Sequence, residues 1–525
     1  MKNQSLRAFL VSGILLVSSL AGCSANVENE ANGGTQTNAV NYKNEAYADA
    51  AYENIAPEKV DPEWNTEEYK FLSENCFQSV TANPFATFAA DVDTASYSNF
   101  RRQIVNGQNV QPDSIRVEEF INYFHYDYPE PEGDEPFSIT TEIAPCPWNE
   151  KTQLLSVGLQ TKCLNAENLP RSNLVFLIDV SGSMDNANKL PLVQRSFLTL
   201  IETLDQNDTV SIITYSSGES IILDGANGSQ QQKIAAAIEE LVAHGATQGD
   251  KAIQMAYEIA ESHFIEDGIN RVIMATDGDF NVGITSESEL TRLIQEKAKS
   301  GVYLSVLGYG MGNYKDNKLE SMADHGNGNY AYIDTIDEAR RVLVKEAGGT
   351  LFTVAKDVKL QLEFNPMVIK GYRLIGYENR VMSATDFSDD TKDGGEIGAG
   401  HQVTALFEIV PVDSDFEIPS VDSKYGKTET GSNEFADEIC TLNIRYKLPN
   451  GTESVLKNCP VTKDSFRDTM SENLSWAAGV AEVAMLLKGS AYKGTSSLKD
   501  AKDLLTPAAN DDFRREFLEL ISKIK

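Results

Sequence analysis

Five oxygen-bearing side chains, at separated places in the chain, have the types and spacing of a metal site. Asp179, Ser181 and Ser183 alternate within one short segment, and Thr247 and Asp277 follow much later. Two carboxylates and three hydroxyls are hard ligands, which Mg²⁺ or Mn²⁺ accepts in near-octahedral geometry, with Ca²⁺ as an alternative. Because the hydroxyls are neutral, a bound ion would keep net positive charge. One open coordination position could then take an Asp or Glu carboxylate of a partner.

Catalytic partners for these residues are missing from the sequence. The histidines at 125, 244, 263, 325 and 401 lack the helix-face spacing of zinc ligands, although His244 lies near Thr247. Ser496-Ser497-Leu498-Lys499 matches the S-x-x-K pattern of penicillin-binding nucleophiles, but its companion motifs are absent. No nucleophile–base pair accompanies the proposed ligands, so we interpret the chain as a binding protein and not as an enzyme.

Buried strands must position the two carboxylates. The apolar run Leu174 to Ile178 ends just before Asp179, and Arg271 to Thr276 ends just before Asp277. Continuous apolar runs are typical of strands covered on both faces. Further strands are expected at 209–215, 220–223, 302–307 and 330–334, and helices at 189–204, 230–243, 249–264, 286–299, 315–325 and 336–348. This alternation predicts a mostly parallel sheet wrapped by helices, whose ligands bind at the carboxyl ends of the strands.

Other strand patterns lie on both sides of this α/β region. They are expected at 137–143 and 153–160 before it, and at 358–364, 403–410, 441–447 and 453–457 after it. A helix is expected near residues 117–124, where apolar residues share one face. We therefore predict one β-sandwich-like domain into which the α/β domain is inserted, followed by C-terminal helices. Such an insertion requires the two ends of the inserted domain to lie close together.

The domain boundaries follow from these changes of pattern. We expect a signal peptide at 1–23, a disordered acidic tether at 24–68, an N-terminal segment of helices and strands at 69–169, the α/β domain at 170–350, a β-rich domain at 351–462 and a helical region at 463–525.

The N-terminus has the features of an export signal. Lys2 and Arg7 precede a short apolar run from Phe9 to Leu20, which is too short to span a membrane. Leu20-Ala21-Gly22-Cys23 resembles the lipobox of bacterial lipoproteins, in which the peptide is cut before the cysteine and the thiol receives a diacylglyceryl group. This resemblance implies lipidation of Cys23 and a lipid anchor. The following Ser24 implies the outer membrane in a cell with two membranes, or the outer face of the plasma membrane in a cell with one.

The metal-ligand segments resemble the von Willebrand factor type A domain. Its metal-ion-dependent adhesion site has the pattern D-x-S-x-S, a separate threonine and an aspartate in T-D-G, which the segments 176–184, 245–247 and 275–278 match in order. The resemblance covers roughly residues 170–350 and implies a Rossmann-like fold. Together with residues 276–283, the flanking segments 88–97, 116–128 and 364–380 look like a group of exported bacterial type A proteins that have their own N-terminal segment and C-terminal domain.

The composition and net charge of the chain limit the classes of molecule that it can bind. The chain has 525 residues, a net charge of −33 and 41% hydrophobic residues, which is ordinary for a globular protein. Nucleic acid is excluded as a partner because phosphate binding needs a basic surface. We expect a surface-anchored lipoprotein that binds an acidic residue of a protein, or an acidic glycan. The alternatives are a structural envelope scaffold, in which the metal only stabilises the fold, and an accessory of a metal-dependent hydrolase.

Several further residues are left open by the sequence. Asp279 and Asn281 could bond to the metal ligands or cap the following turn. Asp91 and Asp93 could hold a second cation or belong to a structural loop. Cys440 and Cys459 flank a predicted hairpin and could form a disulfide, although a register shifted by one residue would put them on opposite faces. Pairing of Cys146 with Cys163 is a second possibility.

Overall fold

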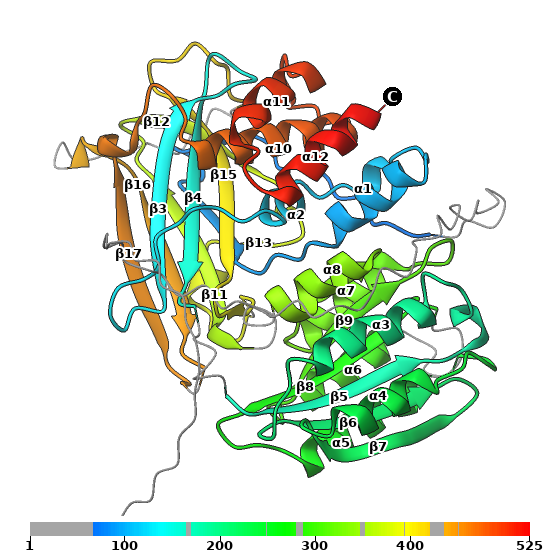
Figure 1. Cartoon of the computed structure of the whole chain (residues 1–525). Helices are drawn as coiled ribbons and strands as arrows, with labels where there is room; N and C mark the ends of the chain where they lie inside the picture. The colour runs from blue at the N-terminus through cyan, green and yellow to red at the C-terminus, as the bar shows by residue number, and fades with distance from the viewer. Residues whose placement is uncertain are drawn as a thin grey trace, which may run out of the picture. The chain divides into compact units, whose positions relative to one another are not determined.

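Three β-sheets and the helices that cover them form the described part of the chain in this computed structural model (Figure 1). The structure describes residues 67–163, 170–247, 249–279, 287–346, 352–392, 394–419, 435–449 and 451–524. Cys23 and Asn281 lie outside these residues. All described residues belong to the unit Glu58–Lys525. None of the helices within them is both long enough and apolar enough to cross a membrane.

The α/β region is built on a six-stranded sheet with the strand order β10-β9-β8-β5-β6-β7. Its strands are β5 (Ser172–Asp179), β6 (Thr209–Tyr215), β7 (Glu219–Asn227), β8 (Ile269–Thr276), β9 (Tyr303–Tyr309) and β10 (Tyr330–Ile333). Neighbouring strands are parallel except for β7, which pairs antiparallel with β6 at the edge. The predicted, mostly parallel sheet is therefore confirmed.

Helices cover both faces of this sheet. They are α3 (Leu190–Ile201), α4 (Gln231–Glu239), α5 (Asp250–Ser262), α6 (Glu287–Ala298), α7 (Asp316–His325) and α8 (Ile336–Arg340). One face packs against α3, α4 and α8, and the other against α5, α6 and α7. Every residue of β5 and β8 is buried, as their apolar sequences require. Phe176 of β5, for example, stacks on Phe197 of α3 with ring centroids 4.3 Å apart.

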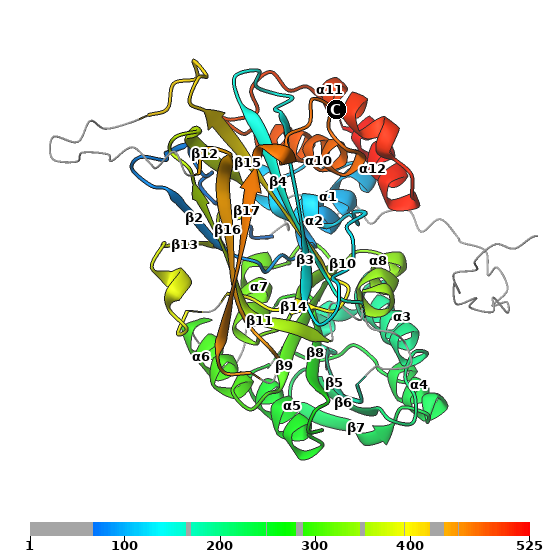
Figure 2. The same cartoon turned by 90° about the vertical axis from the view of Figure 1, so that its left-hand side faces the viewer.

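The flanking strands form two antiparallel sheets packed face to face (Figure 2). One has the order β1-β12-β15-β4-β3 and the other β13-β2-β11-β16-β17, with β14 paired to β11. Their bounds are β1 (Gln78–Ser79), β2 (Phe85–Ala89), β3 (Phe137–Pro145), β4 (Gln153–Thr161), β11 (Thr353–Phe364), β12 (Ile369–Ile375), β13 (Val381–Met382), β14 (Ile397–Gly398), β15 (Gln402–Pro411), β16 (Glu438–Lys447) and β17 (Ser454–Thr462). The α/β region lies between β4 and β11 in the sequence, so its predicted insertion in a β-sandwich is confirmed.

A further layer of helices covers the outer face of the β4–β15 sheet. It comprises α1 (Ala95–Val105), α2 (Val117–Asn122), α10 (Glu472–Lys488), α11 (Leu498–Leu505) and α12 (Asp512–Lys523). Their shared core contains Trp148, Trp476 and Phe517, together with Leu154 of β4 and Leu406 of β15. The predicted C-terminal helices therefore belong to the sandwich body and not to a separate domain.

Two details differ from the sequence-based expectations. The possible disulfide between Cys440 and Cys459 is not formed, and both residues have free thiols. Cys440 lies opposite Val461, and Cys459 lies opposite Leu442, so the cysteines share a face but are diagonal neighbours. Diagonal residues are about 7–8 Å apart, which is too far for a disulfide without backbone movement. Cys146 and Cys163 are likewise free.

The expected helix at 336–348 is the second difference. The α-helix α8 ends at Arg340, and residues Arg341–Lys345 form a π-helical turn. The backbone N–H of Glu346 donates to the carbonyl of Arg341, five residues earlier, at 2.8 Å. This wider turn keeps the Arg341 side chain in contact with Glu338 and Thr94. Apolar periodicity cannot reveal such a turn, because it changes the helix by one residue only.

Candidate metal centre

Two adjacent parallel strands bring the predicted carboxylates together. Asp179 is the last residue of β5, and Asp277 directly follows β8. The two strands are in register, with Ile178 opposite Ala275. Both carboxylates therefore lie at the carboxyl edge of the sheet, and both side chains are fully buried. This is the edge at which open α/β sheets bind ligands.

Asp179 is held by hydrogen bonds from neutral groups. One carboxylate oxygen accepts from the backbone N–H of Ser181 at 2.9 Å, and the other accepts from the hydroxyl of Thr276 at 3.1 Å. In the described part of the chain, no cationic side chain forms an ion pair with it. Burial, with the charge of nearby Asp277, raises the pKa of Asp179 to about 6.

The three hydroxyl residues come from two loops that are fastened to each other. The hydroxyls of Ser181 and Ser183 lie 3.1 Å apart. Between them, the N–H of Gly182 donates to the carbonyl of Gly245 at 3.0 Å, which brings the loop of Thr247 to the same place. Gly245 has a φ of +77°, a conformation that favours glycine. Thr247 is 7% exposed.

Asp277 differs from Asp179 because it already has a cation beside it. The ammonium of Lys189 lies 2.9 Å from its Oδ2, and the side-chain amide of Asn313 donates to the same oxygen at 3.1 Å. Its Oδ1 accepts from the N–H of Asp279 at 3.1 Å. Burial raises the pKa of Asp277, but Lys189 and these hydrogen bonds outweigh burial and hold the pKa below its usual value.

This donor set fits a hard divalent cation. The oxygen atoms of Asp179, Ser181, Ser183 and Asp277 lie at one edge beside Thr247, and the buried carboxylate of Asp179 has only neutral partners within the described residues. A divalent ion would supply the positive charge that the neutral partners of Asp179 do not provide. The five predicted residues would hold it, and its chemistry would be that of an electrophile that binds oxygen anions.

Other residues near the centre have separate roles. The side chain of Asp279 is half-buried, and its pKa is raised by burial and by the charge of Asp277. His244 is exposed, and its ring nitrogen contacts the carbonyl of Val242. Sequence reasoning missed Lys189 and Asn313. A lysine before a helix and an asparagine in a loop carry no signal, since both are common in solvated turns.

A cation is already present at the alternative site. The carboxylates of Asp91, Asp93 and Asp324 lie within 4.8 Å of one another. The guanidinium of Arg380 contacts all three, at 3.2 Å from Asp91, 3.0 Å from Asp93 and 2.9 Å from Asp324. We therefore assign these aspartates to a structural ion-pair network and not to a second metal.

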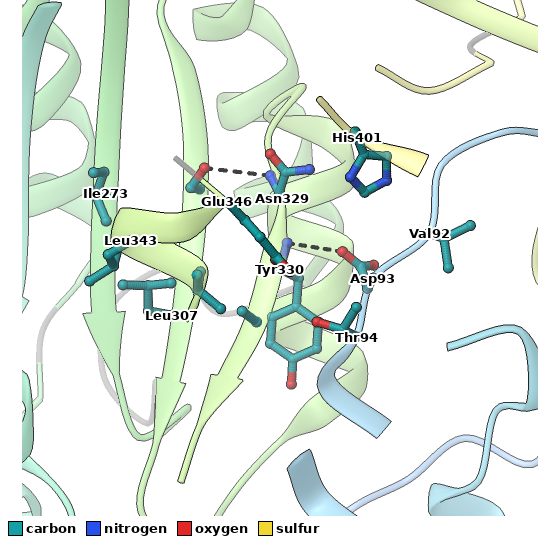
Figure 3. A pocket seen from close by; sticks show the side chains of 13 residues that line it. Val92, Asp93, Thr94, Ile273, Leu307, Asn329, Tyr330, Leu343, Glu346 and His401 are labelled. Carbon is teal, nitrogen blue, oxygen red and sulfur yellow. Dashed lines mark hydrogen bonds between the residues drawn. The ribbon is translucent and has the colours of Figure 1, made fainter. Parts of the chain in front are cut away.

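A pocket elsewhere in the molecule does not overlap the metal centre. It has about 590 Å³ of empty space, some of it open to solvent, and lies between the sheet, the π-helical turn and the loop at Asp93 (Figure 3). Asp93 accepts from the N–H of Tyr330, and Thr94 accepts from Arg341. Burial, with the charge of Arg341, lowers the pKa of His401 to about 4, so this imidazole is neutral. None of the five proposed ligands lines this pocket.

Comparison with known proteins connects this geometry to a family. Residues 173–344 match the model of the von Willebrand factor type A domain, residues 63–156 match a model described as von Willebrand factor, and residues 349–525 match the C-terminal region of the uncharacterized protein YfbK. YfbK from Escherichia coli (strain K12) is 40% identical over 470 residues, which span 87% of this chain and 80% of that protein. The chain belongs to the YfbK family.

More distant relatives share only a part of the YfbK-family chain. Protein sll0103 from Synechocystis sp. is 29% identical over 167 residues, which cover 32% of this chain and 39% of that protein. The human inter-alpha-trypsin inhibitor heavy chain H3 is 30% identical over 173 residues, 31% of this chain and 19% of that protein. Type A domains commonly mediate protein–protein interactions through a metal site of this kind.

Solved structures with the same kind of domain are weakly similar. The von Willebrand factor type A protein from Catenulispora acidiphila has a TM-score of 0.40 and 14% identity, covering 86% of this chain and 91% of that chain. The ArnB paralog VWA2 from Sulfolobus acidocaldarius has a TM-score of 0.37 and 15% identity, covering 74% and 98%. These similarities are too weak to support a functional argument.

Proposed function

We propose that this YfbK-family protein binds a protein ligand through a divalent cation held by Asp179, Ser181, Ser183, Thr247 and Asp277. The observation that carries the proposal is the buried carboxylate of Asp179, which has only neutral partners in the described structure and lies beside a second carboxylate. Burying such a charge is costly unless a cation compensates it. A divalent ion would do so and would take an acidic side chain of the partner in its open position.

Binding is a better account of this site than catalysis. Metal-assisted hydrolysis requires a base within hydrogen-bond reach of the attacking water. The side chains that contact Asp179 and Asp277 carry hydroxyl, ammonium or amide groups: those of Ser181, Ser183, Tyr215, Thr276, Lys189 and Asn313. None of these groups is a general base while Lys189 is paired with Asp277. We therefore propose that the protein is not an enzyme.

The cellular location completes the proposal. The lipobox-like segment Leu20-Ala21-Gly22-Cys23 supports lipidation of Cys23 and anchoring at the cell envelope. Two acyl chains give stable anchoring, whereas one is marginal. Labelling cells with an alkyne-tagged palmitate tests this. The wild-type chain should carry the label, and Cys23→Ser should not. Equal labelling of the two chains would overturn the lipid anchor.

Metal-dependent capture from the cell envelope tests the binding function. The wild-type chain should retain a protein ligand in about 1 mM Mn²⁺, a concentration high enough to load a metal site of moderate affinity. It should release the ligand in excess EDTA. Asp179→Ala and Asp277→Ala should lose both the bound Mn²⁺ and the ligand. Asp337→Ala removes an exposed carboxylate of α8 and serves as the control. Protease treatment of the envelope distinguishes a protein ligand from an acidic glycan.

Two results would contradict the proposal. If Mg²⁺, Mn²⁺ and Ca²⁺ all failed to bind the wild-type chain in calorimetric titrations, the proposed metal centre would be refuted. If EDTA lowered the melting temperature but left ligand capture unchanged, the metal would only stabilise the fold. That second result would favour the envelope scaffold.

A further inference from the structure

Lys189 has a place at the metal centre that the ligand pattern does not require. We propose that it is a positioning residue with a built-in charge: it compensates Asp277 before metal arrives, and it leaves the loaded centre with surplus positive charge that favours an anionic ligand. This inference rests on the proposed function, since it concerns the same centre. It adds that the charge of Lys189 sets the balance between affinity for the metal and affinity for the ligand.

The contacts of Lys189 fix its ammonium on Asp277. Its Nζ lies 2.9 Å from Asp277 Oδ2 and 3.1 Å from Asn313 Oδ1. The residue is 4% exposed. Its side-chain stem packs against Gly310, where an added Cβ would lie 2.3 Å from the lysine Cε. A side chain at position 310 would therefore displace the lysine.

Asn313 closes a triangle with these two charged groups. Its amide nitrogen donates to Asp277 Oδ2 at 3.1 Å, while its oxygen accepts from Lys189. The loop that carries Asn313 is held by a residue from outside the α/β domain, because the N–H of Gly312 donates to Glu67 at 2.8 Å. The backbone of Lys189 is also fixed, since its carbonyl accepts from Leu192 and Val193 in the first turn of α3. The ammonium therefore has a defined position.

The position of this ammonium changes the net charge of the metal-loaded centre. Among the buried groups, Asp179 and Asp277 contribute two negative charges, and Lys189 cancels one of them. Asp279 is only half-buried, and Lys315 and Lys318 also lie near its carboxylate. A divalent ion then leaves one surplus positive charge, whereas without the lysine the centre would be neutral. In a buried site, where charges interact strongly, the ammonium repels the metal and strengthens attraction for an incoming anion. A singly charged carboxylate is the ligand that restores neutrality.

Removing the lysine charge should therefore strengthen metal binding. Lys189→Met keeps most of the stem, and Lys189→Gln also keeps a hydrogen-bond donor for Asp277. We expect both variants to bind Mn²⁺ about tenfold more tightly than the wild-type chain in titrations followed by electron paramagnetic resonance. Lys297→Met is the matched control. It removes the same charge from the distant helix α6, where Lys297 lies 3.9 Å from Glu261, and should bind Mn²⁺ like the wild-type chain.

Two additional measurements identify the role of the charge. In EDTA, Lys189→Met should melt at a lower temperature than the wild-type chain, because Asp277 loses its cation, and Mn²⁺ should raise its melting temperature by more. With Mn²⁺ bound, acetate should displace less metal-bound water from this variant than from the wild-type chain, measured by water-proton relaxation. If the variants fail to fold in EDTA, Mn²⁺ should restore folding, and no restoration would overturn the proposal.

The outcomes separate this inference from the proposed function. If the wild-type chain binds no divalent ion, both fail. If the wild-type chain binds Mn²⁺ and both Lys189 variants bind it equally or more weakly, only the built-in charge is refuted. If Lys297→Met tightens Mn²⁺ binding as much as Lys189→Met, the effect belongs to overall charge, and the inference again fails.

Discussion

Single side chains at the metal centre have opposite electrostatic surroundings. Asp179 and Asp277 are equally buried and lie at the ends of neighbouring strands. Asp277 has an ammonium and two N–H donors, whereas the described partners of Asp179 are all neutral: a backbone N–H and side-chain hydroxyls. Without metal, a cation therefore compensates the negative charge of Asp277, whereas the negative charge of Asp179 is not compensated.

Replacing Asp179 with Asn should separate stability from metal binding. The change removes a buried charge and its repulsion of Asp277, so the metal-free variant should gain about 1–2 kcal/mol in free energy of unfolding at pH 7.5. The same change should abolish stabilisation by Mn²⁺. Urea titrations with EDTA and with Mn²⁺ measure both effects. A metal-free variant less stable than the wild-type chain would contradict this account.

A second buried carboxylate should make stability depend on pH. Glu482 lies in α10, is 1% exposed and accepts a hydrogen bond from Ser496 at 2.7 Å. Burial raises its pKa from 4.5 to about 7. Because the folded pKa is the higher one, the protonated form favours folding. Its contribution is complete below pH 4.5 and is lost as the pH rises through 7.

Glu482→Gln should therefore stabilise the protein only at higher pH. At pH 8 the variant should exceed the wild-type chain by about 1–3 kcal/mol in free energy of unfolding, and at pH 4.5 the two should be nearly equal. Glu519→Gln changes an exposed residue of α12 and is the control. Urea titrations across this pH range measure the difference. A constant difference at all pH values would show that Glu482 does not titrate as described.

At the scale of elements, the sequence predicted the strands and helices better than the contacts between loops. The apolar run of β5 and the T-D-G segment after β8 located Asp179 and Asp277, because buried parallel strands and their carboxyl ends have clear patterns. Lys189 and Asn313 could not be located. Their roles depend on a loop 124 residues away from the lysine in the chain, and no local pattern encodes such a contact. The strand β12 was missed for a related reason: its polar residues Lys370 and Arg373 interrupt the alternation.

A short segment at the start of the described chain fastens the loop behind the metal centre. Glu67 accepts from Gly312 at 2.8 Å and forms an ion pair with buried Arg102 at 2.8 Å. The next residue continues the contact, since the N–H of Glu68 donates to the carbonyl of Tyr314 at 3.1 Å. Asn313 lies between these two attachment points. The segment therefore helps to hold the amide that contacts Asp277.

Glu67→Ala should destabilise this attachment far more than Glu68→Ala. Loss of Glu67 leaves the guanidinium of Arg102 buried without the carboxylate of its ion pair, which should cost about 3 kcal/mol in free energy of unfolding. Glu68 pairs with Lys315 but is 68% exposed, so its loss should cost less than about 1 kcal/mol. Urea titrations of both variants measure the contrast. Equal losses would show that the segment is held by its backbone contacts and not by the buried ion pair.

At the scale of the molecule, buried arginines join the inserted domain to the body around it. Arg116, at the start of α2, lies 2.8 Å from Asp316 and 2.9 Å from Glu320, both on α7 of the inserted domain. Arg101 of α1 contacts Glu338 of α8 at 2.7 Å. Arg380, after β12, pairs with Asp324 on α7. Acidic side chains of α7 and α8 therefore pair with cations of the flanking elements.

Removing one of these arginines should loosen α7 selectively. Arg116→Met leaves Glu119, Asp316 and Glu320 buried without that cation, and the free energy of unfolding should fall by about 3–5 kcal/mol. Hydrogen exchange should accelerate in α7, which carries two of these acids, but not in α4 on the opposite face of the sheet. Arg515→Met is the control, because Arg515 is 55% exposed and pairs only with its helix neighbour Asp512 among the ion pairs of the described chain. Equal acceleration in α4 and α7 would mean that the arginine stabilises the whole protein and does not fasten this particular helix. Unchanged exchange in both helices would mean that the ion pairs contribute little, because their desolvation offsets their attraction.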